Sequence, residues 1–375
     1  MIIKLGEEIE EYTLRNKKDE DIPVYSVTND KGFCTGYFSK DVSSKDQSTY
    51  KIVPYGCFAY NPSRINVGSV DWQHCEDKVI VSPLYVVFKV SNKINPQYLY
   101  YYLKSDIART YIKATAAGSV RDNLKFSMLK EFPFNLRTLE EQSKIVKVLE
   151  RVENNIELCK KRAEYLDTLV KSRFIEMFGD MKLNKRGWKL KSFEELTYLI
   201  TDGEHATPKR TDKGIYLLSA RNILNHSLQL KDVDYINEKE YDRIAKRIIP
   251  QEGDILISCS GTVGRCCSVP SGFHFQMVRS VALIRFKEYI NPIFAEYMIT
   301  SDYLQEQINS SKTVSSQANL FQGKIRTLKG FVPPIEMQNE FSVFVHKIDK
   351  SKLAVQKSLD ELETLKKSLM QEYFG

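Results

Sequence analysis

Residues 139–180 read LEEQSKIVKVLERVENNIELCKKRAEYLDTLVKSRFIEMFGD, and this stretch decides the fold. Apolar residues recur along it at alternating spacings of four and three, interrupted only at Arg173. The apolar stripe consists of Ile145, Leu149, Val152, Ile156, Cys159, Ala163, Leu166, Val170 and Met177. Glu and Lys fill the other faces, and neither Gly nor Pro falls inside the stripe. This pattern predicts a long coiled-coil helix.

A second stripe of the same kind closes the chain. It consists of Phe341, Val345, Ile348, Val355, Leu359, Leu362, Leu369 and Tyr373, broken at Lys352 and Lys366. Each helix would be about 50 Å long at 1.5 Å per residue. The alternative is an ordinary amphipathic helix packed on its own block, but ~35 residues is long for a globular helix. Pro133 and the pair Pro333-Pro334 mark where each preceding block ends.

The two helices belong to a tandem duplication. Five groups of residues recur at one offset of 196 positions, which is a period typical of duplicated domains. The groups are Ile94-Asn95-Pro96 with Ile290-Asn291-Pro292, Ser105-Asp106 with Ser301-Asp302, Asn123-Leu124 with Asn319-Leu320, Gln142 with Gln338, and Phe178-Gly179 with Phe374-Gly375. The order is therefore block A, helix, block B, helix.

The two copies differ most in their early segments. Lys4-Leu5 best matches Lys189-Leu190, a shift of 185, so block B carries roughly a dozen extra residues there. A shared scaffold with divergent early segments suggests two different readers. Because the repeats are so similar, we expect the helices to form an antiparallel pair with pseudo-twofold symmetry, a bar with one block at each end. Gly375 would then return to the start of block A.

Each block is predicted to be α+β. Residues 79–81, 85–88, 255–257 and 281–284 have the composition of strands. Asn95-Pro96 and Asn291-Pro292 are typical of a capped helix start, with Pro in the first turn. We therefore expect α+β domains at 1–137 and 181–333, a central scaffold helix at 138–180 and a C-terminal scaffold helix at 334–375.

Composition indicates a soluble protein whose positive charge is concentrated in the two blocks. Lys and Arg exceed Asp and Glu by 3 in residues 1–137 and by 6 in 181–333, whereas each helical stretch carries −1. A polyanion-binding surface would produce this pattern, and so would chance. The chain has no apolar run long enough to span a membrane and no signal-peptide pattern at its start. Its seven cysteines lack a C-x-x-C pair, which favours reduced thiols and a cytoplasmic location.

Three groups of loop residues are candidates for contacts with a nucleic acid. The first group is residues 61–68 of block A with 258–265 of block B, where small hydroxyl residues and Gly stand beside Arg. Such a loop lets backbone approach phosphates while Arg reaches a base or a phosphate. A tight turn between strands would have the same composition. The candidates here are Arg64, Asn66, Ser260, Thr262 and Arg265.

The second and third groups supply further polar side chains. The second precedes each scaffold helix, and its members are Ser119, Arg121, Asn123, Lys125, Ser315, Ser316, Gln317 and Asn319. Asn123 and Asn319 could instead cap helices. The third is confined to block B, and its members are His205, Thr207, Lys209, Arg210 and Arg221. A plain surface loop is the alternative for this third group.

The motifs expected of an enzyme are missing from the sequence. No G-x-x-x-x-G-K-[ST] phosphate loop and no H-E-x-x-H or paired-Cys metal site occurs. Asn61-Pro62 is followed by Ser63-Arg64, so the Asn-Pro-Pro-Tyr type of motif of adenine methyltransferases is absent as well. We therefore expect a non-catalytic chain that binds no metal or cofactor.

The order and duplication of these motifs resemble the specificity subunits of type I restriction-modification enzymes. Pro334-Ile335-Glu336-Met337-Gln338 is close to the family's Pro-x-x-Glu-Gln, and Leu139-Glu140-Glu141-Gln142 keeps Glu-Gln but has Thr138 where proline is common. Residues 202–208, DGEHATP, and 60–65, YNPSRI, resemble recurrent loops of target recognition domains. The likeness covers nearly the whole chain, although block A lacks the preceding helix of some relatives.

This resemblance implies a function. Each block would read one half of a bipartite site on double-stranded DNA, and the helix pair would set the unread spacer. Two methyltransferase subunits would dock on the scaffold and methylate adenine with S-adenosylmethionine. Restriction subunits using ATP and Mg²⁺ would join for cleavage.

Two other functions compete with this hypothesis. One is a coiled-coil assembly scaffold whose blocks bind proteins, which would lack the steep salt dependence of phosphate contacts. The other is a self-contained nuclease or methyltransferase, for which the sequence offers no cofactor or metal constellation.

Overall fold

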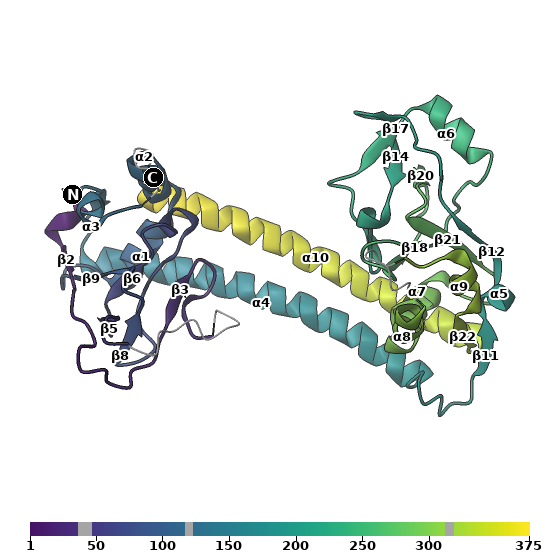
Figure 1. Cartoon of the computed structure of the whole chain (residues 1–375), viewed down its shortest axis with the longest axis horizontal. Coiled ribbons are helices and arrows are strands. Elements are labelled where there is room, and N and C mark those ends of the chain that lie inside the picture. Colours follow the sequence, from purple (N-terminus) through teal and green to yellow (C-terminus); the bar gives the residue numbers. More distant parts are fainter. Residues whose placement is uncertain (37–46, 117–122, 312–318) are drawn as a thin grey trace. The chain divides into compact units, whose positions relative to one another are not determined.

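The computed structural model describes residues 1–36, 47–116, 123–311 and 319–375, and these form two compact units (Figure 1). Unit 1 comprises Met1–Lys161 with Gln356–Gly375, and unit 2 comprises Arg162–Val355. Each unit therefore contains one block with the start of one long helix and the end of the other. None of the helices in the described ranges is long and apolar enough to cross a membrane.

Unit 1 is built on a four-stranded antiparallel sheet. Its strand order is β2 (Ile9–Glu11), β9 (Val86–Val90), β6 (Phe58–Tyr60) and β7 (Val70–Trp72). The rings of Phe58 and Phe88 stack at 5.1 Å between neighbouring strands of this sheet. Three strand pairs complete the unit: β1 (Ile2–Lys4) with β10 (Pro133–Asn135), β3 (Ser26–Thr28) with β4 (Gly32–Cys34), and β5 (Lys51–Pro54) with β8 (Lys78–Val81).

Three short helices follow the sheet of unit 1: α1 (Pro96–Lys104), α2 (Asp106–Ala116) and α3 (Phe126–Leu129). Two 3₁₀ turns, η1 (Leu5–Glu7) and η2 (Ile65–Val67), lie earlier in the chain. The predicted cap at Asn95 is confirmed, because its side chain accepts hydrogen bonds from the backbone N–H groups of Gln97 and Tyr98. Helix α1 buries Tyr98, Leu99 and the neighbouring aromatic residues in the core.

Unit 2 repeats this sheet and adds a second one. The repeated sheet has the order β12 (Thr197–Asp202), β21 (Val281–Phe286), β18 (Ile255–Ser258) and β19 (Cys266–Ser268). The pair of β11 (Lys189–Ser192) with β22 (Lys329–Val332) matches β1 with β10. The added sheet has the order β13 (Arg210–Thr211), β17 (Asp234–Ile236), β14 (Ile215–Leu218) and β20 (Phe275–Met277).

The remaining elements of unit 2 are short. They are α5 (Phe193–Leu196), η3 (Ala220–Asn222), the hairpin β15 (Ile223–Leu224) with β16 (Ser227–Leu228), α6 (Glu238–Ala245), α7 (Pro292–Thr300), α8 (Asp302–Ser310) and α9 (Gln322–Thr327). Asn291 caps α7 as Asn95 caps α1. Within unit 2, α6 lies over the added sheet, whereas α7 and α8 lie against the long helices (Figure 1). The predicted mixture of α and β in both blocks is confirmed.

The long helices are α4 (Leu139–Phe178) and α10 (Ile335–Phe374), with 40 residues each. In both units their segments run antiparallel, because Glu153 pairs with Lys366 and Lys160 with Glu363 in unit 1. In unit 2, Lys352 bonds Asp167 at 2.5 Å and Arg173 bonds Glu340 at 2.8 Å. The three basic residues that interrupt the apolar stripes therefore each hold a carboxylate of the opposite helix. A coiled coil along the full length stays a prediction.

The repeated glutamines fasten each long helix to its own block. Gln142 donates to the carbonyl oxygens of Lys93 and Arg137, and its Oε1 accepts from the backbone of Asn95 at 2.8 Å. Gln338 makes the equivalent bonds with Tyr289, Pro333 and Asn291. Both glutamines are fully buried. Because each side chain bonds one amide N–H and two carbonyls, it holds the helix start against the Asn-Pro turn.

The repeated Phe-Gly ends are anchors as well. The ring of Phe374 lies 5.1 Å from Tyr98, and that of Phe178 lies 4.8 Å from Phe294, which is the position equivalent to Tyr98. Phe374 thereby joins the core of unit 1, which confirms the prediction that the C-terminal residues return to block A.

One proposed alignment is wrong. The equivalent of Lys4-Leu5 is Ser192-Phe193, a shift of 188 and not 185, because Leu5 N–H donates to Phe132 O as Phe193 N–H donates to Leu328 O. Leu5 and Phe193 are both fully buried, whereas Leu190 is 44% exposed. The sequence alignment matched the two Lys-Leu pairs, but the structurally equivalent residues are Leu5 and Phe193, which are both buried in the core.

Candidate nucleic-acid interface

The first candidate loop of block B connects β18 to β19. Its shape is held from within, because Ser258 Oγ donates to Thr262 O at 2.6 Å and accepts from Arg265 N–H at 3.0 Å. Gly261 and Gly264 have φ values of 70° and 94°, in the left-handed region that favours glycine. Ser260, Thr262 and Arg265 are partly or fully exposed on this loop. It is the turn between strands that composition allowed, and it presents hydroxyl and guanidinium groups.

The second group meets the first. Leu320 N–H donates to Cys259 O at 2.9 Å, and Asn319 forms a β-bridge with Ser260. In unit 1, Leu124 N–H donates to Pro62 O at 3.1 Å. The interpretation of Asn123 and Asn319 as helix caps is wrong, because α3 and α9 begin after Lys125 and Phe321. Two loops distant in sequence therefore lie together in both units.

The third group lies on the same side of unit 2. Asp202 accepts from His205 and Arg247, each at 2.7 Å, and Arg247 also donates to Gly203 O. A Cβ atom on Gly203 would lie 2.3 Å from Met277 O, so only glycine fits against that strand. His205 and Thr207 are exposed. The DGEHATP loop is thus held in place at Asp202 and Gly203, whereas its residues His205 and Thr207 are exposed to solvent.

The turn Val278–Ser280, between β20 and β21, joins the first and third groups. Arg279 N–H donates to Glu204 O, Ala220 N–H donates to Ser280 Oγ, and Cys259 N–H donates to Ser280 O. Sequence reasoning missed Arg279, which is exposed at the centre of this cluster, and also Arg247. No sequence signal marks Arg279, because its role arises from long-range pairing.

Two predicted arginines share one carboxylate. Arg210 Nε lies 2.9 Å from Asp234 Oδ2, and an Arg221 Nη atom lies 3.1 Å from Asp234 Oδ1. Asp232 is a second, looser partner of Arg221 at 3.6 Å. Asp234 is 27% exposed on the side chain, whereas Asp232 is 82% exposed. The carboxylate of Asp234 therefore fixes the direction of both guanidinium groups.

Two residues near this cluster, Glu240 and Cys259, have shifted pKa values. The side chain of Arg243 lowers the pKa of the Glu240 carboxyl below its ordinary value, and Glu240 also accepts from the backbone of Lys209. Burial raises the pKa of the Cys259 thiol to about 12. Lys209 is exposed beside these residues.

In unit 1 two of the candidates line a groove of about 760 Å³. Arg64 and Asn66 contribute to it together with three tyrosines, Tyr25, Tyr50 and Tyr85. Tyr60 OH donates to Leu124 O at 3.1 Å, next to the second group. Asn123 is half-buried and Lys125 is exposed. Aromatic faces beside an amide and a guanidinium suit contacts with nucleotides.

The other candidates lie outside the described residues: Ser119, Arg121, Ser315, Ser316 and Gln317. Within the described ranges, no group of three or more His, Cys, Asp and Glu side chains is placed to hold a metal ion.

Comparison with known proteins shows which protein family has this architecture. The family model described as "Type I restriction modification DNA specificity domain" matches residues 6–167 and again residues 185–364. The MjaIX type I restriction enzyme specificity subunit of Methanocaldococcus jannaschii is 26% identical over 301 residues, which cover 73% of this chain and 67% of that protein. A putative MjaX specificity subunit of the same organism is 22% identical, covering 89% and 80%.

Solved structures agree on the fold. A chain of a type I R-M system, solved to explain complex assembly and conformational transition, superposes with a TM-score of 0.62 at 17% identity. The match covers 100% of this chain and 97% of that one. The S subunit of a type I restriction-modification system from M. genitalium gives a TM-score of 0.57 at 15% identity, covering 100% and 96%.

Proposed function

Because the chain belongs to the type I restriction-modification DNA specificity family, with two tandem recognition domains of mixed α and β structure, we propose that it selects the DNA site for such a complex. Each recognition domain reads one half of a bipartite site. The helices α4 and α10 form an antiparallel coiled coil that sets the unread spacer.

One observation carries this proposal. The same pair of loops meets in each unit, through Leu124 N–H to Pro62 O and Leu320 N–H to Cys259 O, yet the side chains on those loops differ. Loops that have the same position in both units but carry different side chains are suited to bind two different base sequences on one DNA duplex. Arginines near such loops can contact both phosphates and guanine edges.

The partners follow from the family. Two methyltransferase subunits dock on the helix pair and methylate adenine, and restriction subunits join for cleavage. S-adenosylmethionine belongs to the methyltransferase subunit, and ATP with Mg²⁺ belongs to the restriction subunit. The chain itself is non-catalytic and contributes site selection. The family match does not favour the alternative of a coiled-coil scaffold for protein partners.

Genome-wide mapping of methylated adenines tests the proposal. Cells expressing this chain with the methyltransferase subunit of the same system should carry methylation at one bipartite motif with a fixed spacer. Replacing residues 181–333 by the equivalent block of another specificity subunit should change one half of that motif and leave the other half intact. Methylation at a continuous motif, or a change in both halves, would contradict the proposal.

A single substitution in a reading loop provides a finer test. Arg265→Ala should lower methylation of the cognate site and relax one half-site, at a cost of about 1–3 kcal/mol if Arg265 contacts a base edge. Lys185→Ala is a matched control, because Lys185 is an exposed cation of the same unit in the turn after α4. Equal losses for the two variants would remove Arg265 from the interface.

A further inference from the structure

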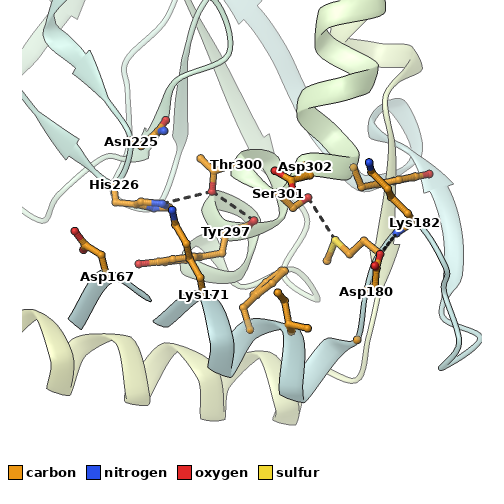
Figure 2. Close-up of a pocket in the computed structure, with 15 residues that line it drawn as sticks. Asp167, Lys171, Asp180, Lys182, Asn225, His226, Tyr297, Thr300, Ser301 and Asp302 are labelled. Carbon is orange, nitrogen blue, oxygen red and sulfur yellow. Dashed lines mark hydrogen bonds between the residues drawn. The ribbon is translucent and has the colours of Figure 1, made fainter. Parts of the chain in front are cut away.

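Each unit contains a pocket beside the end of a long helix, and equivalent residues line the two pockets. In unit 2 a pocket of about 530 Å³ lies between the end of α4, α7 and the start of α8 (Figure 2). In unit 1 a pocket of about 510 Å³ lies between the end of α10, α1 and the start of α2. At the repeat offset of 196, Asp167 matches Glu363, Lys171 matches Lys367, Tyr297 matches Tyr101, and Asp302 matches Asp106.

Core packing explains part of this correspondence. Tyr101 and Tyr297 are 2% and 8% exposed, and each contributes to the hydrophobic core of its unit. The serine before each aspartate caps α2 or α8 through its hydroxyl group. These residues would be retained in both copies of the repeat for stability alone.

The charged residues on the long helices are different. Lys171 and Lys367 are exposed, and among the described residues neither forms an ion pair. Figure 2 shows Lys171 extending from α4 beside Tyr297. Asp167 and Glu363 are 63% and 55% exposed and already pair with Lys352 and Lys160. Folding does not require an exposed, unpaired lysine at the same place in both copies.

The rest of each pocket differs between the units. His226 from the β15–β16 turn enters the pocket of unit 2, where its ring stacks on Tyr297 at 4.0 Å. Lys104 and Arg109 line the pocket of unit 1, and unit 2 has Thr300 and Gln305 at the equivalent positions. The constant part of each pocket is thus the side formed by the long helix and the tyrosine. A surface retained in two copies with divergent readers fits a partner that is the same at both places.

We propose that the two pockets are docking sites for the same segment of two methyltransferase subunits, one in each unit. This inference rests on the proposed function and assigns the place of docking. An apolar side chain of the partner packs on Tyr297 and Phe174, or on the equivalent Tyr101 and Met370. A carboxylate of the partner faces Lys171 or Lys367, because among the described residues these lysines are the repeated charges that form no ion pair in either unit.

Charge reversal at the two lysines tests the inference. We expect the wild-type chain to bind two copies of the methyltransferase subunit of its system, counted by native mass spectrometry of the purified complex. Lys171→Glu and Lys367→Glu should each reduce that number to one, and the double variant to none at the same concentration. Each reversal should weaken its own site at least tenfold while duplex binding by the chain is unchanged.

Lys161→Glu with Lys357→Glu is the matched control. These lysines also occupy equivalent positions of the repeat on α4 and α10, are exposed, and lie outside both pockets. The control should still bind two copies, with circular dichroism confirming that all variants fold. Two copies on the Lys171→Glu/Lys367→Glu chain, or loss of both copies from either single variant, would overturn the inference.

Two other outcomes separate this inference from the proposed function. A wild-type chain that binds duplex DNA but no methyltransferase subunit contradicts the proposed function itself, whatever the variants do. Self-association of the chain that the double variant abolishes would assign the pockets to a second copy, and would also overturn the inference.

Discussion

At the scale of single residues, Asp234 stands out because one half-buried carboxylate holds two arginines. A guanidinium that is fixed on one side by a carboxylate loses fewer conformations when it meets a base edge. It also keeps less net charge for unspecific attraction to phosphates. We therefore propose that Asp234 is a positioning residue, which would favour base contacts over phosphate contacts by Arg210 and Arg221.

We predict that Asp234→Asn relaxes one half of the recognised motif. The expected loss of discrimination is about 1–2 kcal/mol, or roughly tenfold, because a good arginine–guanine contact contributes about 1–3 kcal/mol. Unspecific duplex binding should rise and its salt dependence should steepen. Selection from a random duplex pool measures both effects. Asp232→Asn removes the exposed partner of Arg221 and should leave the motif sharp, whereas an unchanged motif in Asp234→Asn would refute this role.

Gly203 makes a prediction about stability. A Cβ atom there would lie 2.3 Å from Met277 O, so Gly203→Ala forces the DGEHATP loop away from its strand. We expect a loss of about 2 kcal/mol or more in the free energy of unfolding, since such strain exceeds ordinary surface effects. Gly323→Ala is the control, because that position meets no atom within 4 Å and lies in α9. A thermal melt in which both variants unfold alike would contradict the close approach.

The thiol of Cys259 reports on the loop between β18 and β19. Its pKa of about 12 leaves on the order of 10⁻⁴ thiolate at pH 8, and only the thiolate is alkylated. The folded-state pKa exceeds the ordinary value of 9.0, so this group stabilises the fold below pH 9 and that contribution is lost as pH rises toward 12. Iodoacetamide at pH 8 should label exposed Cys75 and spare Cys259 until the loop opens. Equal labelling, followed by peptide mass spectrometry, would contradict this burial.

At the scale of elements, the long helices are joined to their blocks through single buried side chains. Gln142→Ala removes three hydrogen bonds and leaves the backbone groups at Lys93, Asn95 and Arg137 without that partner. We expect a cost of about 2–3 kcal/mol, because buried polar groups left unpaired are expensive. Hydrogen exchange should rise around residues 93–96 and 137. Gln356→Ala, on an exposed face of α10, should change neither exchange nor stability by more than about 0.5 kcal/mol.

Element boundaries and long-range pairings differ in how far the sequence predicts them. The strands at 79–81 and 255–257, the helix starts at Asn95 and Asn291, and the apolar stripes follow from local periodicity and capping chemistry. The added sheet of unit 2 could not be predicted, because β14 pairs in parallel with β20, a strand far along the chain with several other elements in between. The wrong alignment of Lys4-Leu5 with Lys189-Leu190 has a similar cause, because residue identity alone does not show which side chain is buried.

The candidate interface shows the same division. Loop composition proposed Arg64, Arg210, Arg221 and Arg265, and the structure places Arg64 and Arg265 in loops, Arg210 in β13 and Arg221 in η3. It could not identify Arg279, because the turn that carries it is placed by hydrogen bonds to Glu204 and Cys259. Nor could it reveal that Asp234 forms ion pairs with two of the predicted arginines, because these pairs depend on how the strands are arranged in the fold.

At the scale of the whole molecule, the proposed ruler makes a geometric prediction. Inserting four residues into both α4 and α10 adds about 6 Å of helix, against about 3.4 Å for each base pair of DNA. We expect the spacer of the methylated motif to lengthen by one or two base pairs with both halves unchanged. Inserting four residues into the 181–187 turn, outside both helices, should leave the spacer as it was. Altered bases in either half would refute the ruler.

The packing of the Phe374 ring against Tyr98 and Tyr102 has a consequence for folding during synthesis on the ribosome. The domain that emerges first cannot complete its aromatic core until residues 369–374 have been made, long after its last strand, β10, and after the whole second block. The earliest domain to be translated is thus the last to be finished, and a few missing residues at the far terminus would harm it first.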